Sequence, residues 1–396
     1  MTGEPIRVHR GHMRDPHSLY QALRDQGPVR PARFHSRLPG WLVTGYAEAR
    51  QLLGDPRLSK DSARALELFP PGTAGAYASA LSAHMLNSDP PDHTRLRELV
   101  NKVFTARAVA RLRPRIEQIA TDLVDAMAPG GSADLIEVYA FPLPITVICE
   151  VLGVPDGDRD RFREWTRPFV GATDAEELAR AQRELTAYMD TLVAAKRAAH
   201  GDDLLSELTR VSDAGDRLSH AELVSMAFLL LVAGHETTVN LIGNSVLALL
   251  RNPAQMAALR ADPSLLPAAV EEFLRYDGPI NIATVRFTTA PVSVGGVEIP
   301  AGEFVMISLL AANRDAGRFP DPDLLDLARP AAGHLGFGHG VHHCLGAPLA
   351  RLEAQIALGR LLGRFPAMTL DADPADLRWR DSTLIHGLHS LPVRLA

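Results

Sequence analysis

Apolar residues recur at three- and four-residue spacing along most of the chain, which is the period of an amphipathic helix. This pattern predicts helices over residues 94–104, 111–126 and 175–200. A longer helix is expected to begin at Ser219, which has the capping-box spacing with Glu222, and to end before Asn252-Pro253. At about 1.5 Å per residue its length is roughly 48 Å, enough to cross a whole domain.

Two regions alternate apolar and polar residues instead, as half-buried strands do. Residues 29–34 and 41–44 flank the turn signal Leu38-Pro39-Gly40 and predict one hairpin. Residues 292–299 alternate around Gly295-Gly296 and predict a second hairpin. Helical spacing returns over residues 348–362. We therefore predict a mainly α fold with small β-sheets, of the α+β class.

Composition and charge exclude several classes of protein. The chain is 46% hydrophobic and 22% charged, as soluble globular proteins are. Its net charge of −6 argues against nucleic acid as a partner, and two cysteines exclude a disulfide framework. The N-terminus has no signal-peptide pattern, and the longest apolar run, residues 223–234, is too short to span a membrane. We expect a cytoplasmic protein that does not enter a membrane.

Length alone suggests two or three domains for 396 residues. However, the sequence contains no Pro/Ser/Gly-rich linker, low-complexity tract or internal repeat that would separate them.

The most informative segment is a glycine-rich loop that carries Cys344 and precedes Pro348 and an apolar helix. Glycine lets backbone approach a flat ligand closely, and Pro348 suits the first position of a helix. The helix N-terminus favours a thiolate over a thiol. A thiolate that faces open space suits metal ligation, and on a haem iron it favours O–O cleavage.

Other interpretations of the cysteines and of this loop are weaker. Cys149 lies in an apolar stretch and is expected to be a buried core residue. His339, His342, His343 and Cys344 could form a zinc site, but they lack a second cysteine and the paired spacing of structural zinc ligands. A dinucleotide-binding loop fails because its third glycine would fall on Val341.

Residues 337–346 resemble the haem-binding loop of cytochromes P-450, F-G-x-G-x-H-x-C-x-G, at every fixed position. The resemblance implies haem b as cofactor, with Cys344 as the axial ligand of the iron, Phe337 beside the sulfur and His342 on a haem propionate. Gly346 completes this cofactor-binding set. The resemblance extends over nearly the whole chain and implies one cytochrome P-450 haem domain over residues 1–396, with the long helix crossing over the haem.

Residues 233–238 of the long helix contain glycine and two threonines, which are poor choices for a helix centre. Gly234 removes a side chain where another group can come close, and a packing kink is the alternative. The zinc-protease motif H-E-x-x-H fails because its second histidine would be Val239. The segment resembles the oxygen-activation motif A-G-x-[DE]-T-[TS]. By resemblance Thr237 holds a water beside the dioxygen and Glu236 relays protons, so both are catalytic.

Three more groups of residues resemble family features. Glu272 and Arg275 form an E-x-x-R pair, which alone would be a surface ion pair, and the resemblance joins Arg329 to it as a structural network. By resemblance, His93 and Arg97, one helical turn apart, and Arg286 bind the haem propionates together with His342.

Residues 93–115 carry a local excess of positive charge in an acidic protein, with Glu98 as their sole acidic residue. A solvated helix face would explain it, and docking of an acidic ferredoxin would explain it equally well. The basic residues are Arg95, Arg97, Lys102, Arg107, Arg111, Arg113 and Arg115.

The resemblance implies a monooxygenase that inserts one atom of O2 into a C–H or C=C bond. Electrons would come from NADPH or NADH through a ferredoxin reductase and a ferredoxin. The sequence contains no flavin or nicotinamide fingerprint, so we do not expect a fused reductase. We expect a monomer that acts on an apolar small molecule, free or carrier-bound. The sequence as a whole resembles those of enzymes that tailor secondary metabolites, and several such enzymes oxidise macrolides or other polyketides. The predicted pocket residues are Met85, Leu86, Leu229, Ala233, Ile280, Ile282, Leu384 and Ile385.

Two other functions fit the same fold. A hydrogen-peroxide-driven peroxygenase usually lacks the acid–alcohol pair, so the intact Glu236-Thr237 pair favours the monooxygenase. A non-enzymatic haem sensor would give no NADPH-dependent product with any ferredoxin.

Overall fold

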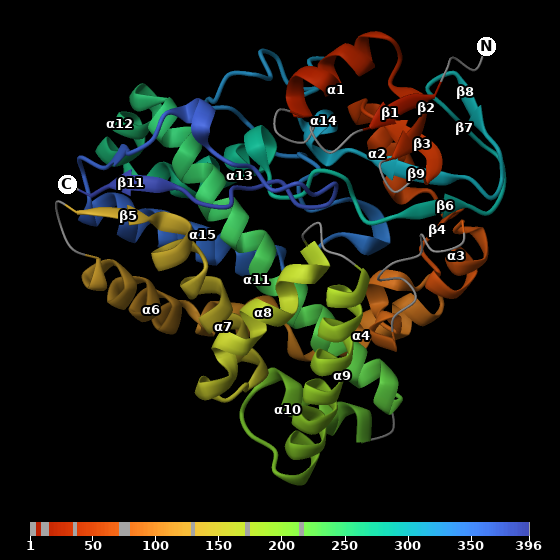
Figure 1. Cartoon of the computed structure of the whole chain (residues 1–396), viewed down its shortest axis with the longest axis horizontal. Coiled ribbons are helices and arrows are strands. Elements are labelled where there is room, and N and C mark those ends of the chain that lie inside the picture. The colour runs from red at the N-terminus through yellow and green to blue at the C-terminus, as the bar shows by residue number, and fades with distance from the viewer. Residues whose placement is uncertain are drawn as a thin grey trace. The chain divides into compact units, whose positions relative to one another are not determined.

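The computed structural model describes residues 5–8, 16–34, 38–70, 80–127, 131–170, 175–213 and 218–395. The chain forms two compact units. Unit 1 consists of residues 1–58, 114–143 and 237–396, and unit 2 of residues 59–113 and 144–236. The long helix α11 (His220–Arg251) contributes to both (Figure 1).

Unit 1 contains a six-stranded sheet in the order β1-β2-β3-β9-β6-β4. Strands β2 and β3 pair antiparallel with Val29 opposite Val43, which confirms the first predicted hairpin. Strand β3 pairs parallel with β9, and both strands are buried as continuous apolar runs. The strands are β1 (Ile6–Val8), β2 (Val29–Phe34), β3 (Pro39–Val43), β4 (Leu58–Ser59), β6 (Arg286–Thr288) and β9 (Phe304–Ile307).

Short helices cover this sheet (Figure 1). They are α1 (Pro16–Asp25), α2 (Tyr46–Gly54) and α14 (Leu309–Asn313). Leu52 of α2 and Leu309 of α14 share one buried apolar cluster with Trp41 and Val305 of the sheet. The second predicted hairpin is confirmed as β7 (Val292–Val294) and β8 (Val297–Ile299).

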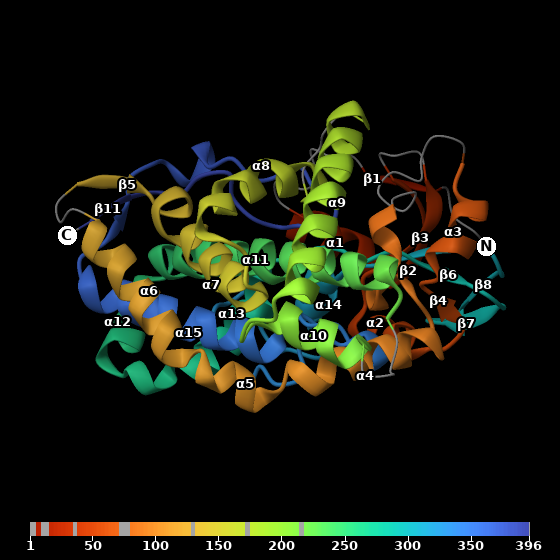
Figure 2. The ribbon, with the colours of Figure 1, turned by 90° about the horizontal axis from the view of Figure 1, so that it is seen from below.

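The rest of unit 1 is mostly helical, and helices α13 and α15 pack side by side (Figure 2). Tyr139 of the π-helix donates a hydrogen bond from its hydroxyl to the carbonyl of Ala357 in α15, at 2.8 Å. A three-stranded sheet has the order β10-β11-β5. The elements are α6 (Arg113–Ala126), β5 (Ser132–Asp134), the π-helix η5 (Ile136–Ala140), α12 (Pro253–Ala261), η7 (Pro263–Leu265), α13 (Leu266–Asp277), η8 (Gly340–His342), α15 (Ala347–Arg364), β10 (Thr369–Leu370), η9 (Pro374–Asp376) and β11 (Pro392–Arg394).

Unit 2 is helical, and its helix α9 packs against α8 and α10 (Figures 1 and 2). The rings of Phe162 and Tyr188 meet edge to face, with centroids 5.1 Å apart, and join α8 to α9. The predicted helices over residues 94–104 and 175–200 are confirmed as α4 and α9. The elements are α3 (Ser62–Leu68), η3 (Ala80–Ser82), η4 (Met85–Asn87), α4 (Asp92–Val103), α5 (Ala106–Arg111), α7 (Pro142–Leu152), η6 (Asp156–Asp158), α8 (Arg159–Val170), α9 (Ala175–Ala198) and α10 (Leu204–Asp213).

Helix α11 begins where the capping box predicts. The Ser219 hydroxyl accepts from the Glu222 N–H at 3.2 Å, and the Glu222 carboxylate accepts from the Ser219 N–H at 2.7 Å. Among the described helices, α11 alone is long and apolar enough to cross a membrane, but 72% of its most apolar stretch is buried inside the protein. That burial is typical of the core helix of a soluble protein.

Candidate active site

Cys344 lies in a tight loop between η8 and α15. Its N–H donates to the carbonyl of Phe337 at 2.9 Å, and the N–H of His343 donates to that of Gly340 at 3.0 Å. Gly338 and Gly340 have φ angles of +72° and +74°, which L side chains rarely adopt. A Cβ at Gly340 would also lie 3.0 Å from the carbonyl oxygen of Leu53, so the loop needs glycine there.

The two cysteines have opposite environments. Cys149 is buried, as expected, and Cys344 is exposed, which is unusual for a cysteine. A Cβ at Gly346 would lie 3.8 Å from the Cys344 sulfur, an ordinary van der Waals contact. One open thiol on a rigid loop suits a single thiolate ligand of a haem iron.

The zinc alternative has no geometric support. Within the described parts of the chain, only one group of three His, Cys, Asp or Glu side chains lies close enough to share a metal ion, and that group does not include Cys344. His339, His342 and His343 therefore do not gather with Cys344 as structural zinc ligands do.

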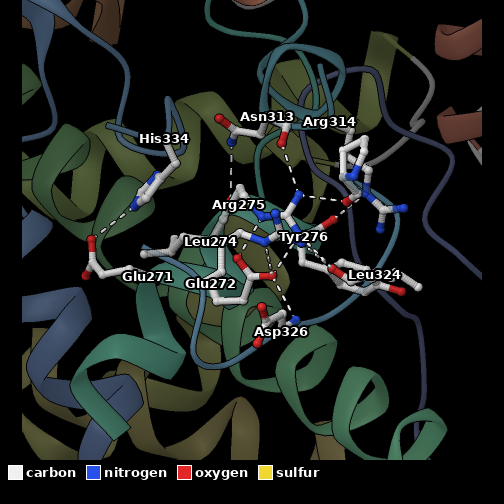
Figure 3. Close-up of polar contacts among 12 residues, drawn as sticks. Glu271, Glu272, Leu274, Arg275, Tyr276, Asn313, Arg314, Leu324, Asp326 and His334 are labelled. Carbon is white, nitrogen blue, oxygen red and sulfur yellow. Dashed lines mark hydrogen bonds and ion pairs between the residues drawn. The ribbon is translucent and has the colours of Figure 1, made fainter. Parts of the chain in front are cut away.

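The ring of Phe337 contacts a cluster of charged and polar side chains that the sequence pattern did not predict. The Arg351 guanidinium lies 4.5 Å from the centroid of the Phe337 ring. It donates to both carboxylate oxygens of Glu271, at 2.6 and 2.7 Å, and His334 lies 3.1 Å from the same carboxylate. Figure 3 shows the contact between His334 and Glu271. Burial alone would raise the pKa of Glu271, but Arg351 and His334 outweigh burial and lower it to about 2.

The low pKa of Glu271 predicts a pH-dependent contribution to stability. Because the folded-state value lies below the ordinary 4.5, the contribution is present above pH 4.5 and is lost as the pH falls toward 2. We expect Glu271→Gln to lower the free energy of unfolding at neutral pH. The difference in free energy of unfolding between wild type and variant, called the gap below, should narrow below about pH 5. Urea unfolding from about pH 7 to about pH 4 measures this gap. The exposed Glu298→Gln is the control, and a gap for Glu271→Gln that stays constant with pH would contradict the assignment.

The structure brings Glu272, Arg275 and Arg329 together in one ion-pair network. Figure 3 shows the pair of Glu272 and Arg275. Arg275 donates to both Glu272 oxygens, at 2.7 and 2.8 Å, and Arg329 donates to one of them at 3.3 Å. The side chains of Glu272 and Arg275 are both 0% exposed. Arg275 also donates to three main-chain carbonyls, those of Asn313, Pro322 and Leu324. Such a completely bonded set is the condition under which a buried ion pair is tolerated.

The predicted propionate ligands occur in both units. In unit 2, His93 is buried in α4, and burial followed by the charge of Arg97 lowers the pKa of His93, so its imidazole tends to be neutral. In unit 1, Arg286 is 4% exposed and donates to the carbonyl of Thr284 at 2.8 Å. His342 is half-buried on η8.

One face of α11 remains accessible in the middle of this otherwise buried helix. Ala233 is exposed and Thr237, one turn later, is half-buried, whereas Leu231, His235 and Val239 are fully buried. The spacing of four residues places Ala233 and Thr237 on one face.

Gly234 allows close packing, in line with the expectation that a side chain is absent where another group approaches. A Cβ at Gly234 would lie 2.9 Å from two side-chain atoms of Ile148 in α7. The absent side chain therefore makes room for Ile148.

Glu236 is buried in unit 2 beside groups that carry exchangeable protons. Its Oε1 lies 3.6 Å from Nε2 of His235, and the same nitrogen lies 3.3 Å from the hydroxyl of Thr166. The other ring nitrogen of His235 lies 2.8 Å from the carbonyl of Leu231. His235 and Thr166 could not be predicted from the sequence, because neither occupies a fixed position of the motif.

A cytochrome P450 family model matches residues 158–384. The chain belongs to the cytochrome P450 family. It is 54% identical over 385 residues to cytochrome P450 107B1 of Saccharopolyspora erythraea, covering 96% of this chain and 95% of that protein. It is 45% identical over 390 residues to 6-deoxyerythronolide B hydroxylase of the same organism, covering 96% of each.

A solved structure confirms the predicted P450 fold. The tirandamycin C-bound P450 monooxygenase TamI matches with a TM-score of 0.95 and 51% identity, over 99% of this chain and 100% of that one. This P450 is thus an oxidoreductase of the monooxygenase type. Membership of the family implies a haem-iron cofactor and the use of O2, which agrees with the exposed Cys344 thiol.

The predicted pocket residues of this P450 are divided between unit 1 and unit 2. In unit 1, Ile280 pairs with Ile385 in a β-bridge, and the N–H of Asn281 donates to the carbonyl of Leu384 at 2.9 Å. Ile282 bridges to Ser308 in the same region. The structure therefore brings Ile280, Leu384 and Ile385 together. In unit 2, Met85 and Leu86 lie on η4, and Leu229 and Ala233 lie on α11.

Proposed function

We propose that this P450 inserts one oxygen atom of O2 into a C–H or C=C bond of an apolar, polyketide-type secondary metabolite. The observation that carries the proposal is the accessible face of α11, which presents apolar Ala233 beside the hydroxyl of Thr237. A large ligand with few polar groups fits such a lining. Two similar proteins, 6-deoxyerythronolide B hydroxylase and the tirandamycin C-bound monooxygenase TamI, support this substrate class.

In this proposal Cys344 would supply the thiolate ligand of the haem iron, Phe337 would pack beside its sulfur, and Gly346 would complete the cofactor-binding loop. His93, Arg97, Arg286 and His342 hold the propionates by hydrogen bonds and charge. The haem, when bound, supplies the iron that activates O2, and the Cys344 thiolate donates the electron density that favours O–O cleavage.

Proton delivery is assigned to the side chains of α11. The Thr237 hydroxyl both donates and accepts, so it can hold a water on the accessible face. The Glu236 carboxylate exchanges protons, and His235 and Thr166 extend the set of exchangeable protons beyond it.

Replacement of Thr237 by alanine should uncouple electron use from product. Without the hydroxyl, protons are delivered out of order, and most NADPH electrons should appear as hydrogen peroxide. Peroxide and product per NADPH oxidised measure the effect. Thr238→Ala is the matched control, because Thr238 is a buried hydroxyl on the adjacent position. Unchanged coupling in Thr237→Ala, or efficient peroxide-driven turnover that survives it, would contradict the monooxygenase assignment of Thr237.

We propose that an acidic ferredoxin, reduced by its reductase, docks on the basic residues of 93–115. Lys102, Arg107, Arg111, Arg113 and Arg115 are exposed. Arg95 contributes less than the sequence suggested, because its guanidinium pairs with Glu222. Reduction by ferredoxin should slow steeply as ionic strength rises, and a salt-independent rate would count against this surface.

We propose that residues 1–396 form one P450 haem domain, which consists of the two compact units described above. We further propose a monomeric, soluble, cytoplasmic enzyme whose substrate arrives free or on a carrier protein.

The experiment that tests the proposed substrate class is a titration of the purified ferric protein, followed at the Soret band. The panel contains macrolides, their aglycones, linear polyketides, steroids and fatty acids. A saturable low-spin to high-spin shift with the polyketides alone would support the proposal. A shift with steroids or fatty acids alone, or no shift beside a normal carbonyl spectrum, would overturn the substrate class.

A further inference from the structure

A cluster of two histidines and one aspartate lies in unit 1. His17, Asp277 and His386 place their ligand atoms within 4.8 Å of one another, although they are far apart in sequence. Nε2 of His17 lies 3.0 Å, and Nε2 of His386 2.9 Å, from the same carboxylate oxygen of Asp277. These residues come from the first turn of α1, the last residue of α13 and the segment before β11.

Contacts from neighbouring residues hold the main chain of Asp277 and both the main chain and the ring of His386. The buried Asn244 of α11 donates to the main-chain carbonyls of both Asp277, at 3.1 Å, and His386, at 3.0 Å. The His386 ring stacks on Trp379 with centroids 4.4 Å apart and planes 13° apart. A site whose ligands are held by such outer contacts loses little freedom when an ion binds.

We propose that His17, Asp277 and His386 bind a divalent transition metal ion of the zinc type. Two imidazole nitrogens and one carboxylate oxygen are a common zinc ligand set, with the fourth position left to water. Metal–ligand bonds of about 2.0–2.2 Å place neighbouring ligand atoms of a tetrahedral ion about 3.3 Å apart. The two observed N···O distances of 2.9 and 3.0 Å are shorter by a few tenths of an ångström, and the two imidazole nitrogens lie within 4.8 Å of each other, so binding requires the imidazoles to rotate.

Exposure provides a path for the ion. The side chains of His17 and Asp277 are 18% and 15% exposed, whereas that of His386 is 4% exposed. Arg314 acts electrostatically on His17, but its guanidinium is paired with Asp323 at 2.9 Å. The residual positive charge should make the affinity moderate rather than very high.

The bound ion would join α1 to the end of α13 and to the segment of His386. Without the ion, these parts are connected by main-chain hydrogen bonds. One runs from the N–H of His386 to the carbonyl of Pro279, at 2.8 Å. Because an ion that binds only the folded protein raises its stability, zinc should raise the melting temperature of the holoenzyme.

The test is calorimetric titration of the chelator-treated, haem-loaded protein with Zn²⁺. We expect one site per chain whose affinity falls at least about tenfold in His17→Gln and in His386→Gln. His17→Gln is the more informative variant, because glutamine can keep a hydrogen bond to Asp277 at this partly exposed position. Zinc should raise the melting temperature of the wild type and not that of His17→Gln.

The matched control is His220→Ala, which breaks a histidine–aspartate pair with a 2.9 Å contact to Asp190 and no third ligand. Its zinc affinity should equal that of the wild type. Equal affinity in wild type and His17→Gln, or no binding to the wild type, would overturn the proposal and leave a hydrogen-bonded His–Asp–His cluster. Zinc binding that persists unchanged in both His17→Gln and His386→Gln would likewise show that the ion binds elsewhere and would overturn the proposal.

Discussion

The Cys344→Ser variant should lose the far red-shifted Soret band of the reduced carbonyl complex, and its monooxygenase turnover should fall below detection. Serine keeps the size of the side chain but supplies no thiolate, so the electron density that favours O–O cleavage is lost. The loop itself should survive, because its hydrogen bonds are made by main-chain atoms of Phe337, Gly340, His343 and Cys344. The measurement is the difference spectrum of the dithionite-reduced protein with and without carbon monoxide.

The other cysteine supplies the control for this experiment. Cys149 is fully buried, and burial raises the pKa of its thiol to about 12, so it remains a neutral core residue. Cys149→Ala should retain the red-shifted band. A band retained in Cys344→Ser, or lost in Cys149→Ala with the fold intact, would refute the ligand assignment.

The elements that the sequence predicted correctly are those with a local physical cause. Helix α11 begins at a capping box and ends before a proline, and both signals are contained within a few residues. The hairpin at Gly295-Gly296 was predictable because both glycines adopt positive φ, at 56° and 75°, which few other residues tolerate. The six-stranded sheet order was not predictable, since β3 pairs with β9 more than 250 residues later.

The same distinction applies to the candidate site. Cys344 and Thr237 could be proposed from the sequence because each lies in a contiguous motif. The cluster of Glu271 with Arg351 was not found, because its members are 80 residues apart and no spacing connects them. The neighbour of Gly234 could not be predicted for a related reason: the atoms that require its small size belong to Ile148 on another helix.

Arg275→Ala should destabilise the protein by about 3–5 kcal/mol and lower the fraction that retains haem. Removal of the guanidinium leaves the fully buried Glu272 carboxylate with only the longer contact from Arg329, at 3.3 Å, and a main-chain N–H of Asp326, at 3.1 Å. It also removes the donors to three main-chain carbonyls. Urea unfolding followed by circular dichroism gives the free energy, and the haem-to-protein ratio gives the retention.

Two variants show whether the cause is the buried network or simply the loss of an arginine. Arg318→Ala removes an exposed arginine from the same region, where it stacks on Phe319, and should cost under about 1.5 kcal/mol. Arg275→Lys keeps the charge but cannot donate as a fork to both oxygens of Glu272, so it should rescue only part of the loss. A loss in Arg275→Ala no larger than in Arg318→Ala would show that the network is dispensable. Full rescue by lysine would show that charge alone, and not the fork of hydrogen bonds, holds this region together.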